Sequence, residues 1–152
     1  MTIDLLDNSK LNPSFVKVIR EAIHLCDHDV RCVEGMRTKQ RQEELWHAGE
    51  DQTGGSARLF GAAATLCIYI DDIPCFGDLI YFDLADSMRF AGQNLNVPIA
   101  WGGAINNKGF VDITSYTNSG AMRALHDSCY EELVESGKSF RPVYQYFQMF
   151  IE

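Results

Sequence analysis

The sequence predicts an α+β domain in which a small antiparallel sheet is flanked by helices. Segments with the apolar spacing of helices alternate along the chain with short runs rich in β-branched residues. Two of these runs are separated only by Asp71 and Asp72, which suits a turn between antiparallel neighbours, although Asn-Gly would be the stronger hairpin signal. A chain of 152 residues is long enough for one domain with a sizeable core.

The first third of the chain is predicted to contain two helices and one strand. The first helix begins at Pro13, because proline suits the first helical position and Asn12 suits the cap. Its core-facing stripe has helical spacing: Phe15, Val18, Ile19, Ala22, Ile23 and Cys26. Residues 30–36 form an expected strand, residues 38–47 a second helix, and the polar, glycine-rich residues 49–57 a loop.

The middle of the chain is predicted to supply most of the sheet. Residues 63–70 and 73–76 are expected strands on either side of the Asp-Asp turn. A long helix is expected over 77–95, and its apolar face consists of Ile80, Leu84, Met88, Ala91 and Leu95. Residues 98–101 and 110–113 are two further expected strands.

The C-terminal part is predicted to be an extension, residues 118–152, packed on a main domain of residues 1–117 within a single overall domain. A helix is expected over 119–136, with Met122, Leu125, Cys129 and Leu133 in one stripe. The tail 138–152 contains five aromatic residues: Phe140, Tyr144, Tyr146, Phe147 and Phe150. The tail either folds back over the sheet or presents a surface for a protein partner, including a second copy in a homo-oligomer.

Composition and charge narrow the classes of partner. A net charge of −8 disfavours nucleic acid and anionic membranes. No apolar run is long enough to span a bilayer, and no secretory signal is visible at the start. Five cysteines without metal-site spacing predict free thiols in a reducing cytoplasm. His24 and His28 have an i, i+4 spacing that can hold a metal, but their neighbours favour a solvated helix face. Neither they nor His47 and His126 fall at the motif positions described below, so no cofactor is expected.

Several segments together resemble a known family. In order, they are Val33-Glu34-Gly35-Met36-Arg37-Thr38, then Gln42, Leu45 and Gly49, then Ser56 through Leu66, then Trp101-Gly102-Gly103. Their order and spacing resemble the zinc D,D-carboxypeptidases and L-alanyl-D-glutamate endopeptidases, which include many phage endolysins. The resemblance implies the D,D-peptidase or Hedgehog-like fold, a phage origin, and residence in the host cytoplasm or in a virion.

The zinc ligands of that family are missing at the matching positions. The family motif Ser-x-His, four residues, Ala-x-Asp-Leu places Arg58 at the first ligand and Thr65 at the second. Its last motif is an acid, two residues, then His-x-Glu, which predicts Asp112 as the retained acid and Ser115 at the third ligand. Arginine has no lone pair to offer and repels a dication, and Thr and Ser hydroxyls are poor ligands. The sequence therefore predicts no metal.

The surviving polar residues of the cleft are predicted to bind a ligand rather than to catalyse. By the resemblance, these residues are Arg37, Gln42, Ser56, Arg58, Trp101 and Asp112. Two arginines could hold a carboxylate or phosphate. Alternatively, Arg37 makes a structural ion pair, and Asp112 pairs with Arg58, whose charge replaces that of the metal.

The sequence thus predicts a catalytically inactive, peptidase-like protein that acts by binding a protein partner or by assembling. One alternative is a non-catalytic binder of a small anion or a peptidoglycan peptide in the vacated cleft. A further alternative is residual peptidase activity, against which the missing ligands count.

Overall fold

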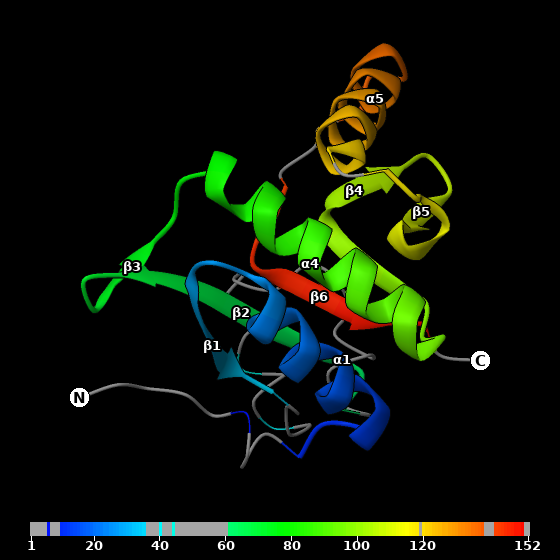
Figure 1. Cartoon of the computed structure of the whole chain (residues 1–152). Coiled ribbons are helices and arrows are strands. Elements are labelled where there is room, and N and C mark those ends of the chain that lie inside the picture. Colours follow the sequence, from blue (N-terminus) through cyan, green and yellow to red (C-terminus); the bar gives the residue numbers. More distant parts are fainter. Residues whose placement is uncertain are drawn as a thin grey trace.

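The computed structural model describes residues 6, 10–35, 40, 44, 61–118, 120–138 and 142–150. These residues form an antiparallel sheet with helices packed against it, as the sequence predicts (Figure 1). The predicted helix 38–47 and loop 49–57 fall almost entirely outside the described residues. Among the residues described, no helix is both long and apolar enough to cross a bilayer.

The sheet has six strands, and its order is β1-β2-β6-β4-β5, with β3 pairing to β2 alone. Every pairing is antiparallel. The strands are β1 (Asp29–Glu34), β2 (Ala63–Ile70), β3 (Ile73–Cys75), β4 (Ile99–Asn106), β5 (Gly109–Asp112) and β6 (Tyr146–Met149).

The helices begin and end where local chemistry favours it. Helix α1 (Pro13–Leu25) is capped by Asn12, whose side-chain oxygen accepts a hydrogen bond from the Ser14 amide at 2.9 Å, as predicted. Helix α4 (Leu79–Leu95) ends at Asn96, which adopts the left-handed conformation with φ 55°. Helix α5 is Ala121–Glu135, and a short 3₁₀ turn, η2, is Ile113–Ser115.

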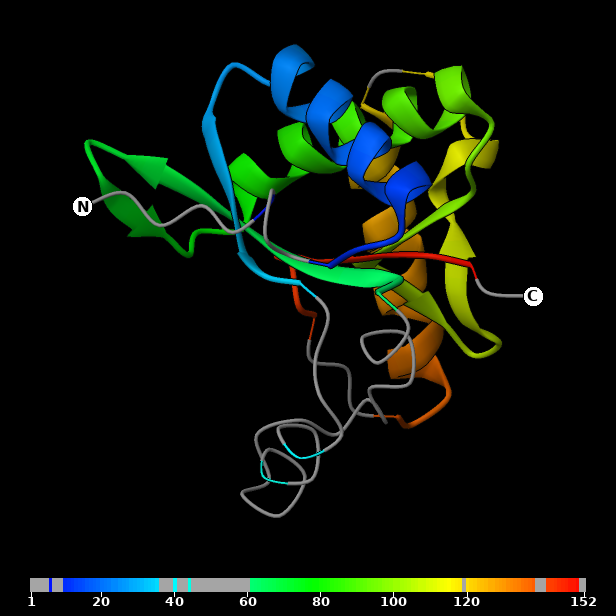
Figure 2. The same ribbon diagram turned by 90° about the horizontal axis from the view of Figure 1, so that it is seen from below.

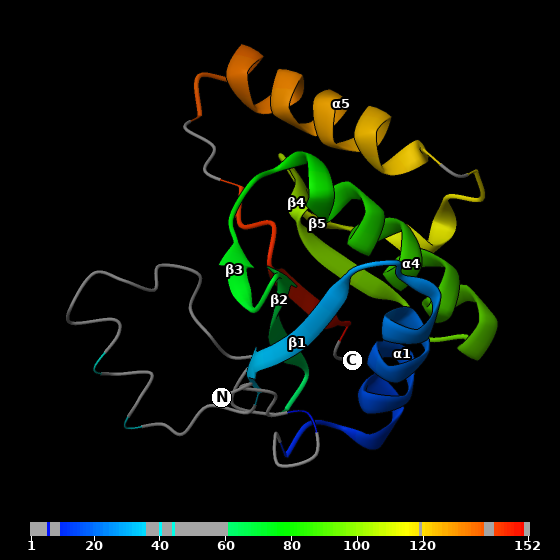
Figure 3. The ribbon, with the colours of Figure 1, turned by 60° about the vertical axis from the view of Figure 1, so that its left-hand side comes forward.

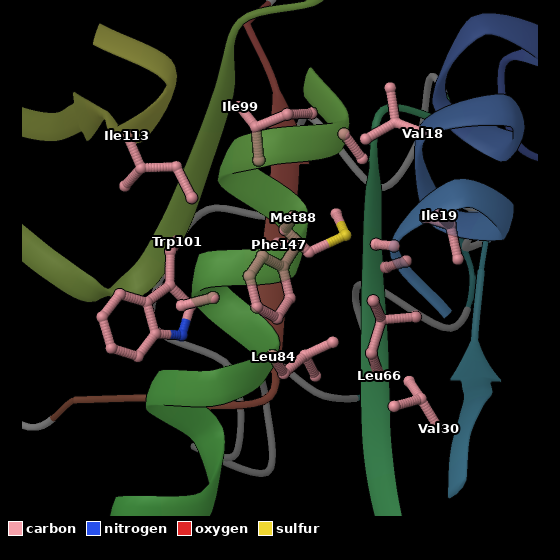
Figure 4. Close-up of a cluster of buried hydrophobic side chains, with 14 of the residues drawn as sticks. Val18, Ile19, Val30, Leu66, Leu84, Met88, Ile99, Trp101, Ile113 and Phe147 are labelled. Carbon is pink, nitrogen blue, oxygen red and sulfur yellow. The ribbon is translucent and has the colours of Figure 1, made fainter. Parts of the chain in front are cut away.

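The main core lies between one face of the sheet and helices α1 and α4 (Figure 2). Leu66, Trp101 and Phe147 from the sheet meet Leu84 and Met88 from α4 in this layer, and all are fully buried (Figure 4). Helix α5 packs beside β4, on the far side of α4 from α1 (Figure 3). The predicted apolar stripe of α5 is buried there: Met122, Leu125, Cys129 and Leu133.

Strands β2 and β3 form the predicted hairpin. Asp71 and Asp72 both have positive φ, 51° and 66°, which is the backbone of a type I′ turn. Aspartate tolerates this region better than most residues, so the hairpin forms without Asn-Gly. The hairpin extends outward from the body of the molecule (Figure 2).

The C-terminal segment is built into the sheet rather than lying over it. Strand β6 pairs with β2 through Ala63–Thr65 and with β4 through Ile99–Trp101. It therefore occupies the middle of the sheet (Figure 1), where Phe147 is fully buried and Tyr146 is buried. The predicted covering tail is corrected accordingly: this segment supplies a central strand that joins two otherwise separate parts of the sheet.

Candidate functional site

The sheet face turned away from α1 and α4 carries the polar residues of interest. Thr65 of β2 lies directly opposite Tyr146 of β6. Two residues further along β6, Gln148 pairs with Ala100 of β4, and Ala100 in turn pairs with Asp112 of β5. Directly opposed residues share a sheet face, as do residues two apart along a strand. Thr65, Tyr146, Gln148 and Asp112 therefore lie on one face, which we call the polar sheet face.

Tyr146 occupies the centre of the polar sheet face. Its side chain is nearly buried, and its hydroxyl donates a hydrogen bond to Oε1 of Gln148 at 2.5 Å. Its ring stacks on Phe110 of β5 with centroids 5.6 Å apart. Together with Ala62 and Ala63 it forms a small apolar cluster separate from the main core. The tyrosine is thus held in one position by neighbours on three strands.

Asp112 and Ser115 make a local turn at the end of β5. The Asp112 carboxylate accepts hydrogen bonds from the amide of Thr114 at 2.9 Å and from its hydroxyl at 2.5 Å. The Ser115 hydroxyl donates to the backbone oxygen of Asp112 at 2.7 Å. Asp112 therefore caps η2, which is a structural role.

Two side chains of α4 fix the turn that contains Ser115. Buried Arg89 donates to the Tyr116 carbonyl at 3.0 Å while forming an ion pair with Asp86 at 2.9 Å. Gln93 donates to the Thr114 carbonyl at 2.9 Å. The buried cation is thus paired and hydrogen-bonded, and it anchors the turn to α4.

The strand order separates Ser115 and Asp112 from Thr65. Strands β6 and β4 lie between β2 and β5, so three strand spacings, about 14 Å along the sheet, separate β2 from β5. A zinc ion holds its ligands at about 2 Å, so Thr65 and Ser115 cannot stand at two ligand positions of one ion. The sequence-based placement of the third ligand at Ser115 does not agree with this geometry, whereas the role of Asp112 as the retained acid stays a prediction.

Trp101 lies in the core and does not line the polar sheet face. Its indole is fully buried, and Nε1 donates to the Tyr144 carbonyl at 2.9 Å. The ring packs edge-on to Phe82 of α4 and close to His126 of α5. The prediction that Trp101 binds a ligand in the cleft does not agree with this position.

The two glycines after Trp101 have packing reasons. A Cβ at Gly102 would lie 2.1 Å from the carbonyl oxygen of Val143, so only glycine allows the C-terminal segment to approach β4. A Cβ at Gly103 would lie 2.5 Å from the Trp101 ring. His126 completes this region: Nδ1 is 2.6 Å from the Gly103 carbonyl oxygen. The Trp-Gly-Gly motif therefore joins β4, α5 and the approach to β6.

The remaining predicted site residues fall outside the described residues. They are Arg37, Gln42, Ser56 and Arg58. Their predicted roles, and the Arg58–Asp112 pair, stay predictions. No cluster of three His, Cys, Asp or Glu residues with metal-binding geometry occurs in the described ranges.

The structure thus combines an antiparallel sheet, helices α1 and α4 on one face, and the polar sheet face on the other. Residues 4–134 match the sequence model of the family described as phage L-alanyl-D-glutamate peptidase, and the chain belongs to that family. It is also similar to the crystal structure of the Serratia marcescens L-Ala D-Glu endopeptidase ChiX. That match has a TM-score of 0.63 and 26% identity, covering 72% of this chain and 84% of the other. The comparison with curated proteins gave no match.

The spacing of the family's last motif can also be placed on β6, which lies beyond the residues 4–134 that match the family. The pattern of an acid, two residues, then His-x-Glu places Val143 at the acid, Tyr146 at the histidine and Gln148 at the glutamate. Thr65, which the sequence resemblance places at the second ligand position, lies directly opposite Tyr146. Tyr146 is therefore the residue nearest to Thr65 across β2 and β6 to which the spacing of this motif leads. The sequence comparison missed it because α5 and its connections separate this segment from Trp-Gly-Gly.

Proposed function

We propose that this chain is a non-catalytic member of the phage L-alanyl-D-glutamate peptidase family, and that it acts by binding a protein partner. The observation that carries the proposal is that Thr65 and Tyr146 lie opposite each other. In this proposal they occupy the second and third ligand positions of the family. Zinc in such sites is held by histidine nitrogen, cysteine sulfur or carboxylate oxygen. An alcohol and a phenol that is hydrogen-bonded to Gln148 do not fit that requirement.

Two further replacements support the proposal. Arg58, at the first ligand position in the sequence, adds a positive charge where a dication would bind. Val143, at the position of the acid that would handle the water proton, has no titratable group. In this proposal the metal ligands and the general base are replaced together. Their joint replacement favours a protein that keeps the fold for binding rather than for catalysis.

A peptidoglycan peptide is the second candidate ligand, because family members such as ChiX act on an L-Ala–D-Glu bond. The hydrogen-bonded pair of Tyr146 and Gln148 offers polar groups on the polar sheet face for such a peptide. In this version the chain holds the peptide without cutting it.

The direct test incubates the purified full chain with muropeptides that contain the L-alanyl-D-glutamate bond, with and without added zinc. ChiX under the same conditions is the positive control. We expect no cleavage by this chain, and zinc far below one ion per chain by elemental analysis. Zinc-dependent cleavage by the unmodified chain would overturn the proposal.

A pair of matched variants tests the assignment of the site. The triple variant Arg58→His, Thr65→Asp, Tyr146→His should bind close to one zinc per chain. The matched triple Arg58→His, Thr65→Asp, Ser115→His should bind far less, because Ser115 lies beyond β5. Higher zinc content in the Ser115 triple than in the Tyr146 triple would reject the assignment to β6.

A further inference from the structure

The projecting hairpin and the start of α4 expose four large apolar side chains within ten residues. Ile70, Ile73, Phe76 and Leu79 are 51%, 66%, 71% and 61% exposed, and we call them the hairpin patch. Ile70 and Ile73 are a cross-strand pair, so they lie on the same face of the hairpin. Phe76 and Leu79 follow them along the chain, between the hairpin and the first turn of α4. Exposed apolar side chains that are close together in this way favour an interaction site.

The hairpin is held in position both at its turn and along its strands. Buried Arg31 of β1 donates to the Asp72 carboxylate in the turn at 2.7 Å, and this contact lowers the pKa of Asp72 from its ordinary value. The Tyr81 hydroxyl of α4 donates to the Cys75 carbonyl at 2.7 Å and accepts from the Ile68 amide at 3.0 Å. A partner would therefore meet a preorganised surface and lose little free energy in ordering it.

The surroundings of the patch are acidic. No lysine, arginine or histidine occurs between Arg58 and Arg89, whereas five aspartates do: Asp71, Asp72, Asp78, Asp83 and Asp86. Three of these five are paired, with Arg31, His28 and Arg89 respectively. Among the described residues, Asp71 and Asp78 have no cationic partner. The patch thus has two uncompensated carboxylates beside its apolar side chains.

We propose that the hairpin patch binds a protein segment whose apolar side chains are flanked by lysine or arginine, such as the face of a basic amphipathic helix. The inference rests on the proposed binding function and identifies its surface and the chemistry of its partner. Charge complementarity favours a basic partner over a second copy of this chain, because a second copy would bring the same carboxylates together. The outer edge of β3 offers little to an added strand, since β3 has three residues and the middle one is Pro74.

The test titrates the full chain into a fluorescent synthetic leucine/lysine amphipathic helix and follows anisotropy. The double variant Ile73→Ser, Phe76→Ser should bind at least about tenfold more weakly, or ~1.4 kcal/mol. Phe90→Ser is the matched control, because Phe90 is an exposed aromatic residue elsewhere on α4, and it should bind like the wild type. Unchanged melting temperatures would show that both variants fold.

A second pair of variants separates the effect of the local carboxylates on binding from the effect of the overall charge of −8. Asp71→Asn, Asp78→Asn keeps residues suited to the turn and the helix cap, and it should weaken binding and reduce its salt dependence. Glu131→Gln, Glu135→Gln removes the same charge from exposed positions on α5 and should bind like the wild type.

Several outcomes would overturn the inference. They are equal binding by every variant, no binding at low salt, equal binding of a leucine/glutamate helix, and self-association of the chain that the double serine variant abolishes. The readout is independent of the cleavage assay. A chain that binds the helix but cuts muropeptides overturns the proposed function alone, and a chain that does neither overturns this inference alone.

Discussion

At the scale of single residues, Gly102 shows how a short motif can be required by packing. The carbonyl oxygen of Val143 occupies the space where any larger residue would place its Cβ. The Val143 amide also donates to the Gly102 carbonyl at 3.2 Å, so the two backbones are in direct contact. The obstacle is backbone, which cannot rotate away as a side chain could.

Gly102→Ala should therefore destabilise the fold, by about 1–3 kcal/mol or more, as overpacking does. Gly77→Ala is the matched control, because its nearest neighbour would be the Cys75 sulfur at an ordinary 3.9 Å and its φ is not positive. Urea unfolding followed by circular dichroism measures both. Equal unfolding midpoints for the two variants would contradict the close approach seen here.

At the scale of secondary-structure elements, β6 determines whether the sheet is continuous. It forms hydrogen bonds to β2 on one side and β4 on the other, and its Phe147 fills the core between sheet and α4. Without it, two strands would expose their backbone groups and the core would open along its middle. The loss of β6 would lower the free energy of unfolding in two ways, because the core would lose a large side chain and backbone groups of β2 and β4 would lose their partners.

Deleting residues 142–152 should abolish cooperative folding, and a synthetic peptide of residues 142–150 should restore it in part when added in trans. Gln148→Thr is the control, because it changes a half-buried polar residue and leaves the strand in place. Far-UV circular dichroism and size-exclusion chromatography provide the measurements. A soluble truncated chain with the unfolding midpoint of the full chain would show that β6 is dispensable.

The difference between predicted and observed elements has a physical reason. Helices α1 and α4 were predictable because caps and apolar stripes are local signals, as at Asn12 and Asp78. Strand β6 was not, because its pairing depends on β2 and β4, which are distant in the sequence, and a strand of four residues is too short to show a clear period. The same reason applies to the candidate site. The sequence places Thr65 in a strand, which the structure confirms, but its neighbour Tyr146 can be found only from the strand pairing.

At the scale of the whole molecule, stability comes from one core shared by the sheet, α1 and α4, with α5 added at β4. The cysteines in the described ranges are free thiols, so no disulfide among them contributes. Burial raises the pKa of the Cys129 thiol, as expected for a structural cysteine on the buried face of α5. The fold thus depends on burial of apolar side chains.

The melting temperature of the wild-type chain should therefore not change when a chelator or zinc is added. The Tyr146 triple variant is the positive control, because a ligand that binds only the folded state raises its stability as the ligand concentration exceeds Kd. Differential scanning calorimetry measures both. A fall in the wild-type melting temperature on chelation would mean that a metal contributes to the native state.

The central position of β6 also has a consequence for how the chain acquires its fold. Strand β6 follows every other strand in the chain, yet it lies between β2 and β4. On the ribosome, the sheet cannot close until residues 146–149 have emerged, and until then β2 and β4 each present an open edge. Pairing over such sequence separations is slow, because loop closure precedes the contacts that reward it. The kinetics of synthesis and chaperone binding, rather than the stability of the finished domain, would then set how much native protein a cell obtains.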